Sequence, residues 1–357
     1  MIGLEPTIEE HLEKMVAVFR EVRRVLRDDG TLWLNYGDAY WGGKGQSAQA
    51  WSTRNLDRDT LQKDYHHVAG KGQTRPTDAR HDLFKPKDLI MMPSRVAMAL
   101  HADRWWVRSE IIWAKRNCMP ESVTDRPTSS HEKIFLMTKS HKYFYDAMAV
   151  RVSGSQNTHA RRKDGQKKPM KGTEENDNRT GTWVDKRTIE EQAAIGTNLR
   201  NVWHLATHPY PGSHFATFPP QLVETCIKAG TSEHGACAKC GAPWVRQTKD
   251  PEGGLTGKSW TDHEDDLQTG HTIYGGQKIY DTYRTRETIG WNASCECSAD
   301  VTPCIVLDCF GGSGTTGLVA DRLQRDAILI EINPEYSEMA HTRILDDAPM
   351  FTEVITE

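Results

Sequence analysis

The stretch that decides the fold is residues 305–316, which read IVLDCFGGSGTT. Its apolar start, ending at Asp308, predicts a buried strand, and the glycines predict a tight turn that opens a helix from Thr315 to Leu323. Ala327 to Glu331 follow as a second strand, and Pro334 begins a final helix after a capping asparagine. A strand, a helix and a strand at this spacing form a βαβ unit, so the sequence predicts a parallel sheet.

The Gly-rich turn is also a candidate binding site for a nucleoside. Glycine lets the backbone approach a ligand closely, and the free N–H groups at the start of a helix suit a polar or anionic group. Glu331 ends the second strand, where a carboxylate can accept hydrogen bonds from both hydroxyls of a ribose. The alternative is an ordinary strand–helix connection with a solvated glutamate. The turn and the acid together favour a nucleoside cofactor.

Ordered segments alternate with polar ones in the rest of the chain. Apolar spacing predicts helices over residues 8–26, 93–102 and 220–229, and strands over residues 31–35, 105–113 and 133–138. Three further stretches, residues 41–82, 153–196 and 250–292, are polar and show no apolar period. We expect long loops or insertions there.

The composition excludes several classes of protein. The 357 residues include 45 Lys and Arg and 49 Asp and Glu, a net charge of −4, so any nucleic-acid-binding surface must be local. Mean hydropathy is −0.66, and no run approaches the roughly 18 apolar residues of a membrane-spanning helix. No apolar leader follows Met1, because Glu5, Glu9 and Glu10 come first. We therefore expect a cytoplasmic protein whose eight cysteines are reduced, with clustered ones holding metal.

Residues 308–317, DCFGGSGTTG, resemble the cofactor motif of DNA methyltransferases that modify exocyclic amino groups with S-adenosylmethionine. That motif usually has Pro at Cys309 and Ala at Gly311. The resemblance continues over residues 28–38, 119–132, 214–219 and 331–336, which together touch every ordered segment. It implies an S-adenosylmethionine pocket lined by Asp308, Phe310, Gly312, Gly314, Thr315, Glu331, Phe218 and Pro219.

The resemblance also implies a domain order. The fold is expected to be α/β and Rossmann-like, a mostly parallel sheet with a β-hairpin edge, long polar insertions and a small zinc-knuckle insertion. The cofactor motif lies at the C-terminal end, as in the permuted class, which includes both N4-cytosine and N6-adenine enzymes. We expect residues 1–150 to form the catalytic half, 151–200 a basic insertion for target recognition, and 201–357 the cofactor half, with the knuckle at about 235–300.

The family's catalytic tetrapeptide, (Asp/Asn/Ser)-Pro-Pro-aromatic, is not in the sequence. Residues 218–221, FPPQ, and 208–211, HPYP, both depart from it. The tetrapeptide is needed because an exocyclic amine is a poor nucleophile that must be polarised and aligned, and an aromatic ring must stack on the extruded base. In the family it comes shortly before the segment that resembles residues 2–7, so we expect this chain to begin just downstream of the catalytic strand.

Three explanations stay open for the missing tetrapeptide: an upstream start, a complementing segment or chain, or a damaged remnant. Each implies unpaired backbone groups and apolar surface at the centre of the sheet of this chain. Asp38 is the best remaining acid near a strand end, but a solvated acid is the better interpretation of it. The catalytic residues are therefore unknown.

Four cysteines have the spacing of a metal site. Cys237 and Cys240 form a CxxC knuckle followed by Gly241, and Cys295 and Cys297 are the natural second pair. Four thiolates would give a closed structural zinc site, which has no open position for catalysis. The alternatives are four unrelated thiols, or Cys304 in place of one member. The other cysteines, Cys118, Cys226 and Cys309, are expected to be buried small side chains.

Double-stranded DNA is the expected partner. A basic run is the best candidate for phosphate contacts, although a solvated loop is the more common explanation of a charge run alone; its members are Arg161, Arg162, Lys163, Lys167, Lys168 and Lys171. Arg126 and Asn117 lie in the segment that resembles the base-proximal loop of the family, with a structural role as the alternative. No residue can be assigned to a base edge.

The sequence thus predicts an S-adenosylmethionine-dependent DNA amino-methyltransferase of restriction–modification or phage type. One alternative is an inactive remnant that binds DNA or cofactor. A further alternative, an RNA or protein amino-methyltransferase, is disfavoured because the matches outside the cofactor motif also follow the DNA enzymes.

Overall fold

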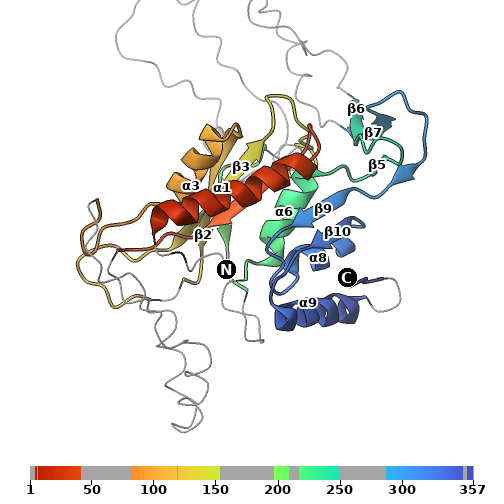
Figure 1. Ribbon diagram of the computed structural model, residues 1–357. Coiled ribbons are helices and arrows are strands. Elements are labelled where there is room, and N and C mark those ends of the chain that lie inside the picture. Colours follow the sequence, from red (N-terminus) through yellow and green to blue (C-terminus); the bar gives the residue numbers. More distant parts are fainter. Residues whose placement is uncertain are drawn as a thin grey trace, which may run out of the picture.

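The central element is a mixed four-stranded sheet (Figure 1). The computed structural model describes residues 5, 7–41, 83–118, 120–152, 197–208, 217–249, 287–348 and 352–356. The strands, in sheet order, are β1 (Thr31–Tyr36), β3 (His131–Thr138), β2 (Trp106–Lys115) and β4 (Val202–Leu205). The pairs β1/β3 and β2/β3 are antiparallel, and β2/β4 is parallel.

The prediction of a mostly parallel sheet with a hairpin at its edge is wrong for this sheet. β2 and β3 follow each other in the chain and pair antiparallel, as strands joined by a loop do. β1 then adds to the free edge of β3 and β4 to the free edge of β2, so the hairpin lies in the middle.

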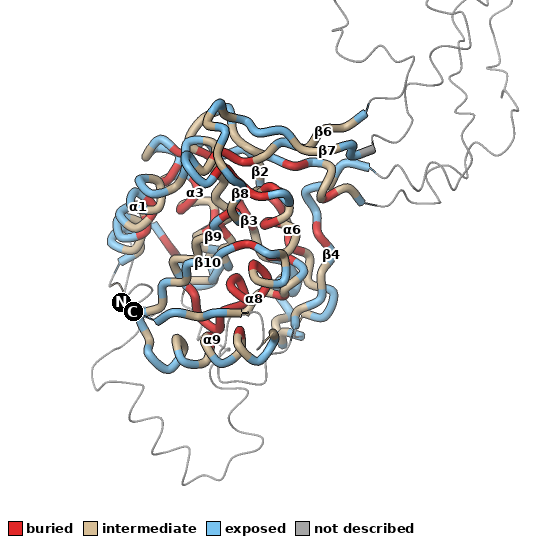
Figure 2. The backbone as a smooth tube through the Cα atoms, turned by 90° about the vertical axis from the view of Figure 1, so that its right-hand side faces the viewer, coloured by how far each residue is buried: buried red, intermediate tan, exposed pale blue. Residues whose placement is uncertain are grey.

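Helices cover both faces of this sheet (Figure 2). α1 (Ile8–Val25) and α3 (Met92–Ala102) lie on one face, where Met15, Leu100 and Leu34 pack together. α6 (Pro220–Gly230) lies on the other face, where Leu222 packs with Trp113. Neighbouring residues of a strand point to opposite faces, and β1 and β3 therefore supply both clusters.

The predicted starts of two helices are confirmed, and in both a side chain caps the first turn. Thr7 caps α1, because its Oγ1 accepts a hydrogen bond from the N–H of Glu10 at 3.1 Å. Asn333 caps α9 (Pro334–Asp347) in the same manner, with Oδ1 accepting from the N–H of Glu335 at 3.0 Å. No helix within the described ranges is long and apolar enough to cross a membrane.

The predicted βαβ unit is present at the C-terminal end. β9 (Ile305–Asp308) leads through α8 (Thr315–Arg322) to β10 (Asp326–Leu329), and the two strands are parallel neighbours. α8 covers the face that carries Val306 and Leu329, and it also packs against α6. Within the described residues β9 and β10 form a sheet of their own, separate from the four-stranded sheet.

The opposite face of this two-stranded sheet carries exposed isoleucines. Ile305 is 64% exposed, Ile328 52% and Ile330 51%, and by alternation all three point away from α8. Among the described residues β9 pairs only with β10, and β1 only with β3. Parallel strands are normally covered on both faces, and this face is the less covered one in the structure.

Four short strands form a separate cysteine module, residues 235–249 and 287–302. β5 (Ala236–Cys237) pairs antiparallel with β8 (Val301–Thr302), and β6 (Trp244–Lys249) with β7 (Glu287–Ala293). The interpretation of residues 250–292 as one polar insertion missed the start of β7. Figure 1 shows β5, β6 and β7 at the upper right, at the other end of β9 from α9.

Candidate functional site

The turn after β9 has a backbone that requires glycine at two positions. Gly312 has φ +51° and Gly314 has φ +74°, both in the left-handed region. Gly314 is the residue before α8, and a Cβ on it would lie 2.8 Å from the Cβ of Ala340 in α9. The glycines therefore allow both the turn and the close packing of α8 against α9.

Asp308 holds this turn from the end of β9. Its Oδ1 accepts a hydrogen bond from the N–H of Phe310 at 2.9 Å, and its Oδ2 accepts one from the hydroxyl of Thr316 at 2.5 Å. The carboxylate thus orients the turn, rather than standing free at the strand end.

Glu331 connects the turn to the loop after β10. Its Oε2 accepts from the N–H of Gly312 at 2.7 Å, and its Oε1 from the N–H of Asn333 at 2.9 Å. Each carboxylate oxygen has a second lone pair, so the group can still accept two hydroxyl hydrogens. The alternative of a solvated glutamate is wrong, because Glu331 is half-buried and bonded on both oxygens.

One aromatic side chain of the turn and two residues before α6 were predicted to line the pocket. Phe310 is 45% exposed and meets Phe19 of α1 edge-on, with the ring centroids 6.4 Å apart. Phe218 packs against α6 and α8, and Pro219 is buried at the start of α6. The structure therefore brings Phe218, from a distant segment, to α8, the helix that follows the turn.

Thr315 has a different role from the one predicted for its side chain. It is buried, and its hydroxyl accepts from Arg343 Nη1 at 2.9 Å. The same nitrogen donates to the carbonyl and the hydroxyl of Ser313, each at 3.0 Å. Arg343 thus fastens α9 to the turn, and sequence reasoning missed it because the contact joins residues 30 apart in the chain.

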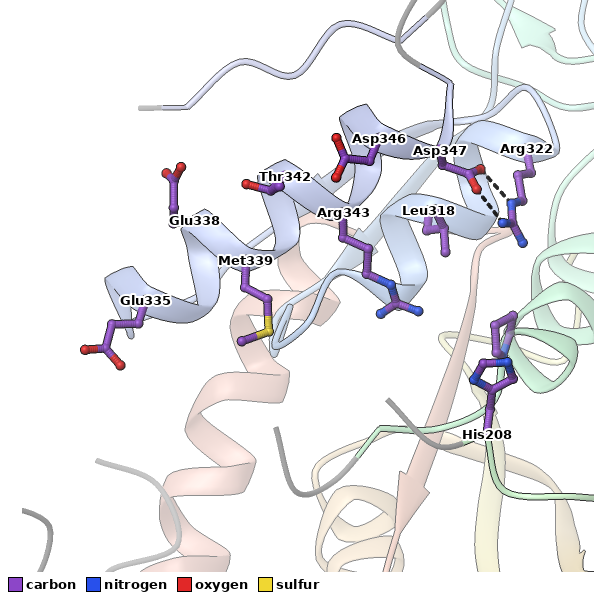
Figure 3. A pocket seen from close by; sticks show the side chains of 11 residues that line it. His208, Leu318, Arg322, Glu335, Glu338, Met339, Thr342, Arg343, Asp346 and Asp347 are labelled. Atoms are coloured by element: carbon purple, nitrogen blue, oxygen red, sulfur yellow. Dashed lines mark hydrogen bonds and ion pairs between the residues drawn. The ribbon is translucent and has the colours of Figure 1, made fainter. Parts of the chain in front are cut away.

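A groove of about 750 Å³ runs beside the turn, between α8, α9, His208 and Pro220 (Figure 3). Arg343 points into it from α9, and Arg322 pairs with Asp347 at its end. That ion pair lowers the pKa of Asp347, mainly through the hydrogen bond from Arg322. Neither Asp308 nor Glu331 lines the groove, so it adjoins the predicted pocket without being that pocket.

A hydrogen-bonded chain at the carboxyl end of β1 was not predicted. His11 Nδ1 lies 2.8 Å from Glu5 Oε2, and His11 Nε2 contacts the hydroxyl of Tyr36. Burial and the nearby charge of Glu5 raise the pKa of Tyr36 to about 12. The apolar spacing of α1 could not predict these hydrogen bonds, because His11 makes them with residues outside the helix.

The residues proposed for DNA contact are held by other groups in this structure. The guanidinium of Arg126 lies 3.9 Å from the ring centroid of Tyr40 and pairs with Glu121 at 2.7 Å. Asn117 bonds to Thr207, accepting from its N–H at 2.7 Å. These contacts support the structural alternative for both residues. The basic run, Arg161, Arg162, Lys163, Lys167, Lys168 and Lys171, lies outside the described residues.

Asp38 also has a structural role. Its Oδ1 accepts from the N–H of Met92, the first residue of α3, at 3.0 Å, and from the N–H of Ala39 at 2.9 Å. The carboxylate therefore satisfies a free donor at the start of a helix. This gives no reason to treat Asp38 as the catalyst.

The four predicted metal ligands come together. The sulfur atoms of Cys237, Cys240, Cys295 and Cys297 all lie within 4.8 Å of one another. Backbone N–H groups of Cys240 and Lys239 lower the pKa of Cys237 to about 7. Neighbouring thiols, Cys240 first among them, raise that of Cys297 to about 12. A compact group of four sulfurs from two distant segments has the donor set of a tetrahedral zinc site.

The other cysteines lie outside this cluster. Cys304 is buried with its thiol 3.7 Å from the carbonyl of Ser232, so it replaces no member. Cys226 is buried, as predicted, and burial raises the pKa of its thiol. Cys118 and Cys309 are only partly buried, so the prediction for them is wrong. Burial also raises the pKa of Cys309, to about 11.

The sheet, the Gly-rich turn and the acid after β10 define the class of this protein. A family model described as DNA methylase, which covers N6 and N4 amino-methyltransferases, matches residues 1–238 and 304–342. Since the match spans more than half of the chain, the chain belongs to this family. The interruption from 239 to 303 coincides with most of the cysteine module.

Individual proteins of the class are similar over nearly the whole chain. The Type II methyltransferase M.SmaI of Serratia marcescens is 33% identical over 344 residues, 96% of this chain and 77% of that protein. The Type II methyltransferase M.Cfr9I of Citrobacter freundii is 32% identical over 347 residues, with coverages of 96% and 74%.

The chain is also similar to solved structures, at low sequence identity. The PvuII DNA methyltransferase (cytosine-N4-specific) has a TM-score of 0.48 at 14% identity, covering 96% of this chain and 73% of that one. A DNA modification methylase of Thermus thermophilus, complexed with S-adenosyl-L-methionine, has a TM-score of 0.42 at 15% identity, with coverages of 98% and 84%.

Proposed function

We propose that this chain takes part in Type II DNA modification, in the transfer of a methyl group to an exocyclic amino group of adenine or cytosine in double-stranded DNA. The observation that carries the proposal is the Glu331 carboxylate. It is held by the N–H of Gly312 and keeps lone pairs for the two hydroxyls of a ribose. Family membership and the Type II relatives support the reaction class.

S-adenosylmethionine would supply the methyl group, and the residues present fit its parts. Glu331 accepts from the ribose hydroxyls, and the half-exposed ring of Phe310 offers a flat apolar face to the adenine. The left-handed φ of Gly312, which glycine adopts without strain, lets the turn bring its backbone close to the cofactor. Thr315 contributes the backbone of the first turn of α8, where free N–H groups suit a polar ligand.

Isothermal calorimetry with S-adenosylmethionine tests this placement. Glu331→Ala removes both acceptors and the link to Gly312, and the affinity is expected to fall at least tenfold, as for hydrogen bonds to a charged group. Glu13→Ala, an exposed carboxylate on α1, is the matched control and leaves the affinity unchanged. Equal affinities for both variants would show that Glu331 does not hold the cofactor.

We further propose that methyl transfer requires a strand from outside residues 1–357, inserted between β9 and β1. Both strands have an unpaired edge among the described residues. The two strands are also near each other, since Cys309 packs against the cluster that contains Leu34 of β1. The sequence has no (Asp/Asn/Ser)-Pro-Pro-aromatic tetrapeptide, which this strand would carry to polarise the amine and stack the base.

A methyl-transfer assay on duplex DNA tests the second proposal. This chain alone is expected to be slower by several powers of ten than the same chain extended at its N-terminus or mixed with a second chain that bears the tetrapeptide. The two additions distinguish an upstream source from a separate chain. Rapid turnover by residues 1–357 alone would mean that a group within this sequence does the chemistry.

We also propose that Cys237, Cys240, Cys295 and Cys297 hold one structural zinc. Their sulfur atoms are the four soft ligands that such a site uses. Metal analysis of the purified chain should give about one zinc per chain, as closed four-thiolate sites do. Cys240→Ser should lower that content, whereas Cys118→Ser, outside the cluster, should not.

DNA itself is proposed to contact the basic run between Arg161 and Lys168. Clustered positive charge in a chain of net charge −4 supports this assignment. Charge reversal of Lys167 and Lys168 should weaken DNA binding for all sequences alike and reduce its dependence on salt. If the salt dependence of DNA binding is unchanged in this variant, the run does not contact DNA.

A further inference from the structure

We propose that the metal held by the four cysteines fastens the β9 half of the molecule to the β1 half, with Arg27 as the link. The inference rests on the zinc site proposed above. The two sheets share no strand among the described residues.

One side of this link is the start of β9. Cys237 belongs to β5, which pairs with β8, and β9 begins three residues after β8 ends. The N–H of Ala238 donates to the carbonyl of Asp300 at 2.8 Å. A Cβ on Gly235 would lie 2.5 Å from the carbonyl oxygen of Thr302, so the backbones are in close contact. A metal ligand is therefore tied directly to the strand that carries the cofactor turn.

The other side of the link is the turn between α1 and β1. Arg27 Nη1 donates to the carbonyl of Cys240, within the knuckle. The same guanidinium donates from Nε and Nη2 to the carboxylate of Asp29, at 2.9 and 3.0 Å. Gly241 has φ +70°, and a Cβ there would lie 3.0 Å from Arg27 Nη1. Glycine thus permits both the knuckle turn and the approach of the guanidinium.

The negative charge of a four-thiolate zinc site favours an arginine, Arg27, as its neighbour. Four thiolates around one Zn²⁺ carry a net charge of −2, and the Arg27 guanidinium lies against the backbone of one ligand. Groups that hydrogen-bond next to the ligands orient them and tune the affinity for the metal. Arg27 therefore has two functions. It compensates the charge of the metal site, and it holds that site against the turn before β1.

An ion pair supports the same junction. Arg246 of β6 lies 2.9 Å from Asp146, which is buried after β3, and 2.5 Å from Glu233. The module therefore contacts the chain after β3 as well as the turn before β1. These contacts lie at the amino ends of β1 and β9, whereas Asp308 and Glu331 are at the carboxyl ends of their strands.

The family model matches nothing between residues 239 and 303, so most of the module is an addition to the part of the chain that the model describes. An addition far from the cofactor residues, bonded to both sheets, fits a structural fastening better than a part in methyl transfer. The metal would replace some of the stabilisation that strand pairing gives elsewhere in the sheet.

Hydrogen exchange of the full chain, followed by mass spectrometry, tests the inference. Removal of zinc by a chelator is expected to speed exchange over residues 28–32 and 301–305 about tenfold, as for loss of a charge-assisted hydrogen bond. Arg27→Gln should keep about one zinc but speed exchange over residues 28–32 and release zinc several-fold faster to a chelator. Arg24→Gln, which loses only an exposed pair with Glu21, is the matched control.

Arg27→Lys keeps the charge without the planar fork and provides a second folded variant, with an intermediate effect expected. A protein that binds zinc, yet exchanges at the same rate over residues 28–32 after its removal, would refute the fastening and leave the zinc site standing. A protein without zinc would refute both. Neither outcome changes the calorimetric test of Glu331, which concerns the methyltransferase site.

Discussion

The substitution Gly314→Ala tests the packing beneath the cofactor turn. Gly314 has φ +74°, and an L-residue held in the left-handed region costs roughly 1–2 kcal/mol. The new Cβ would lie 2.8 Å from the Cβ and 3.0 Å from the Cα of Ala340, and overpacking of this kind costs about 1–3 kcal/mol. The free energy of unfolding is therefore expected to fall by roughly 2–5 kcal/mol, measured by urea denaturation.

A double-mutant cycle separates the two contributions. Ala340→Gly removes the atom that the new Cβ meets, so in Gly314→Ala/Ala340→Gly the packing part should be recovered and the backbone part should remain. Gly37→Ala is the control, because its Cβ would meet only Glu132, at 3.9 Å. A loss below about 1 kcal/mol for Gly314→Ala would contradict the strained turn. So would a cycle with no coupling between the two sites.

Three further predictions concern stability. Thr7→Ala should lower the free energy of unfolding by about 1 kcal/mol in urea denaturation, because the cap of α1 is lost. Arg322 lowers the pKa of Asp347, so the pair stabilises the fold above the unfolded pKa of the carboxyl and loses this effect as the pH falls through the folded pKa. Asp347→Asn should therefore reduce the acid sensitivity of the melting temperature. Tyr36 has a raised pKa of about 12. Its contribution to the stability of the fold is therefore complete below the unfolded pKa near 10 and is lost as the pH rises through 12. Tyr36→Phe should make the melting temperature depend less on pH over that range.

The regular elements could be predicted from the sequence because each carries its own pattern. The apolar spacing of α1 and the Asn–Pro start of α9 are local signals, and the structure has both helices where they predict them. β5 and β8 have two residues each, too few for any alternation to be visible. The predicted order of strands in the sheet was wrong for a different reason. Which strands pair depends on packing between segments that are distant in the chain.

The candidate site divides in the same way. Asp308, the glycines and Glu331 follow from the rule that ligands bind beyond the carboxyl ends of parallel strands. Arg343 and Arg27 could not be predicted, because their partners are 30 and 213 residues away in the chain. Asp38, Asn117 and Thr315 have polar side chains of the right kind near the site, yet each one satisfies a backbone or side-chain donor of the fold.

Two contacts join the β9 half of the molecule to α1 and to the turn that follows it. Both affect how readily a strand could insert between β9 and β1. At the carboxyl end of β9, Phe310 meets Phe19, and at the amino end the knuckle carbonyl accepts from Arg27. Both contacts leave the edges of β1 and β9 without a strand partner among the described residues. Ordering a backbone residue costs about 1–2 kcal/mol. If the two edges are already fixed relative to each other, an inserted strand has only its own residues to order and does not also have to fix the two halves. The cysteine module would then favour completion of the sheet even though it lies far from the methyl-transfer site.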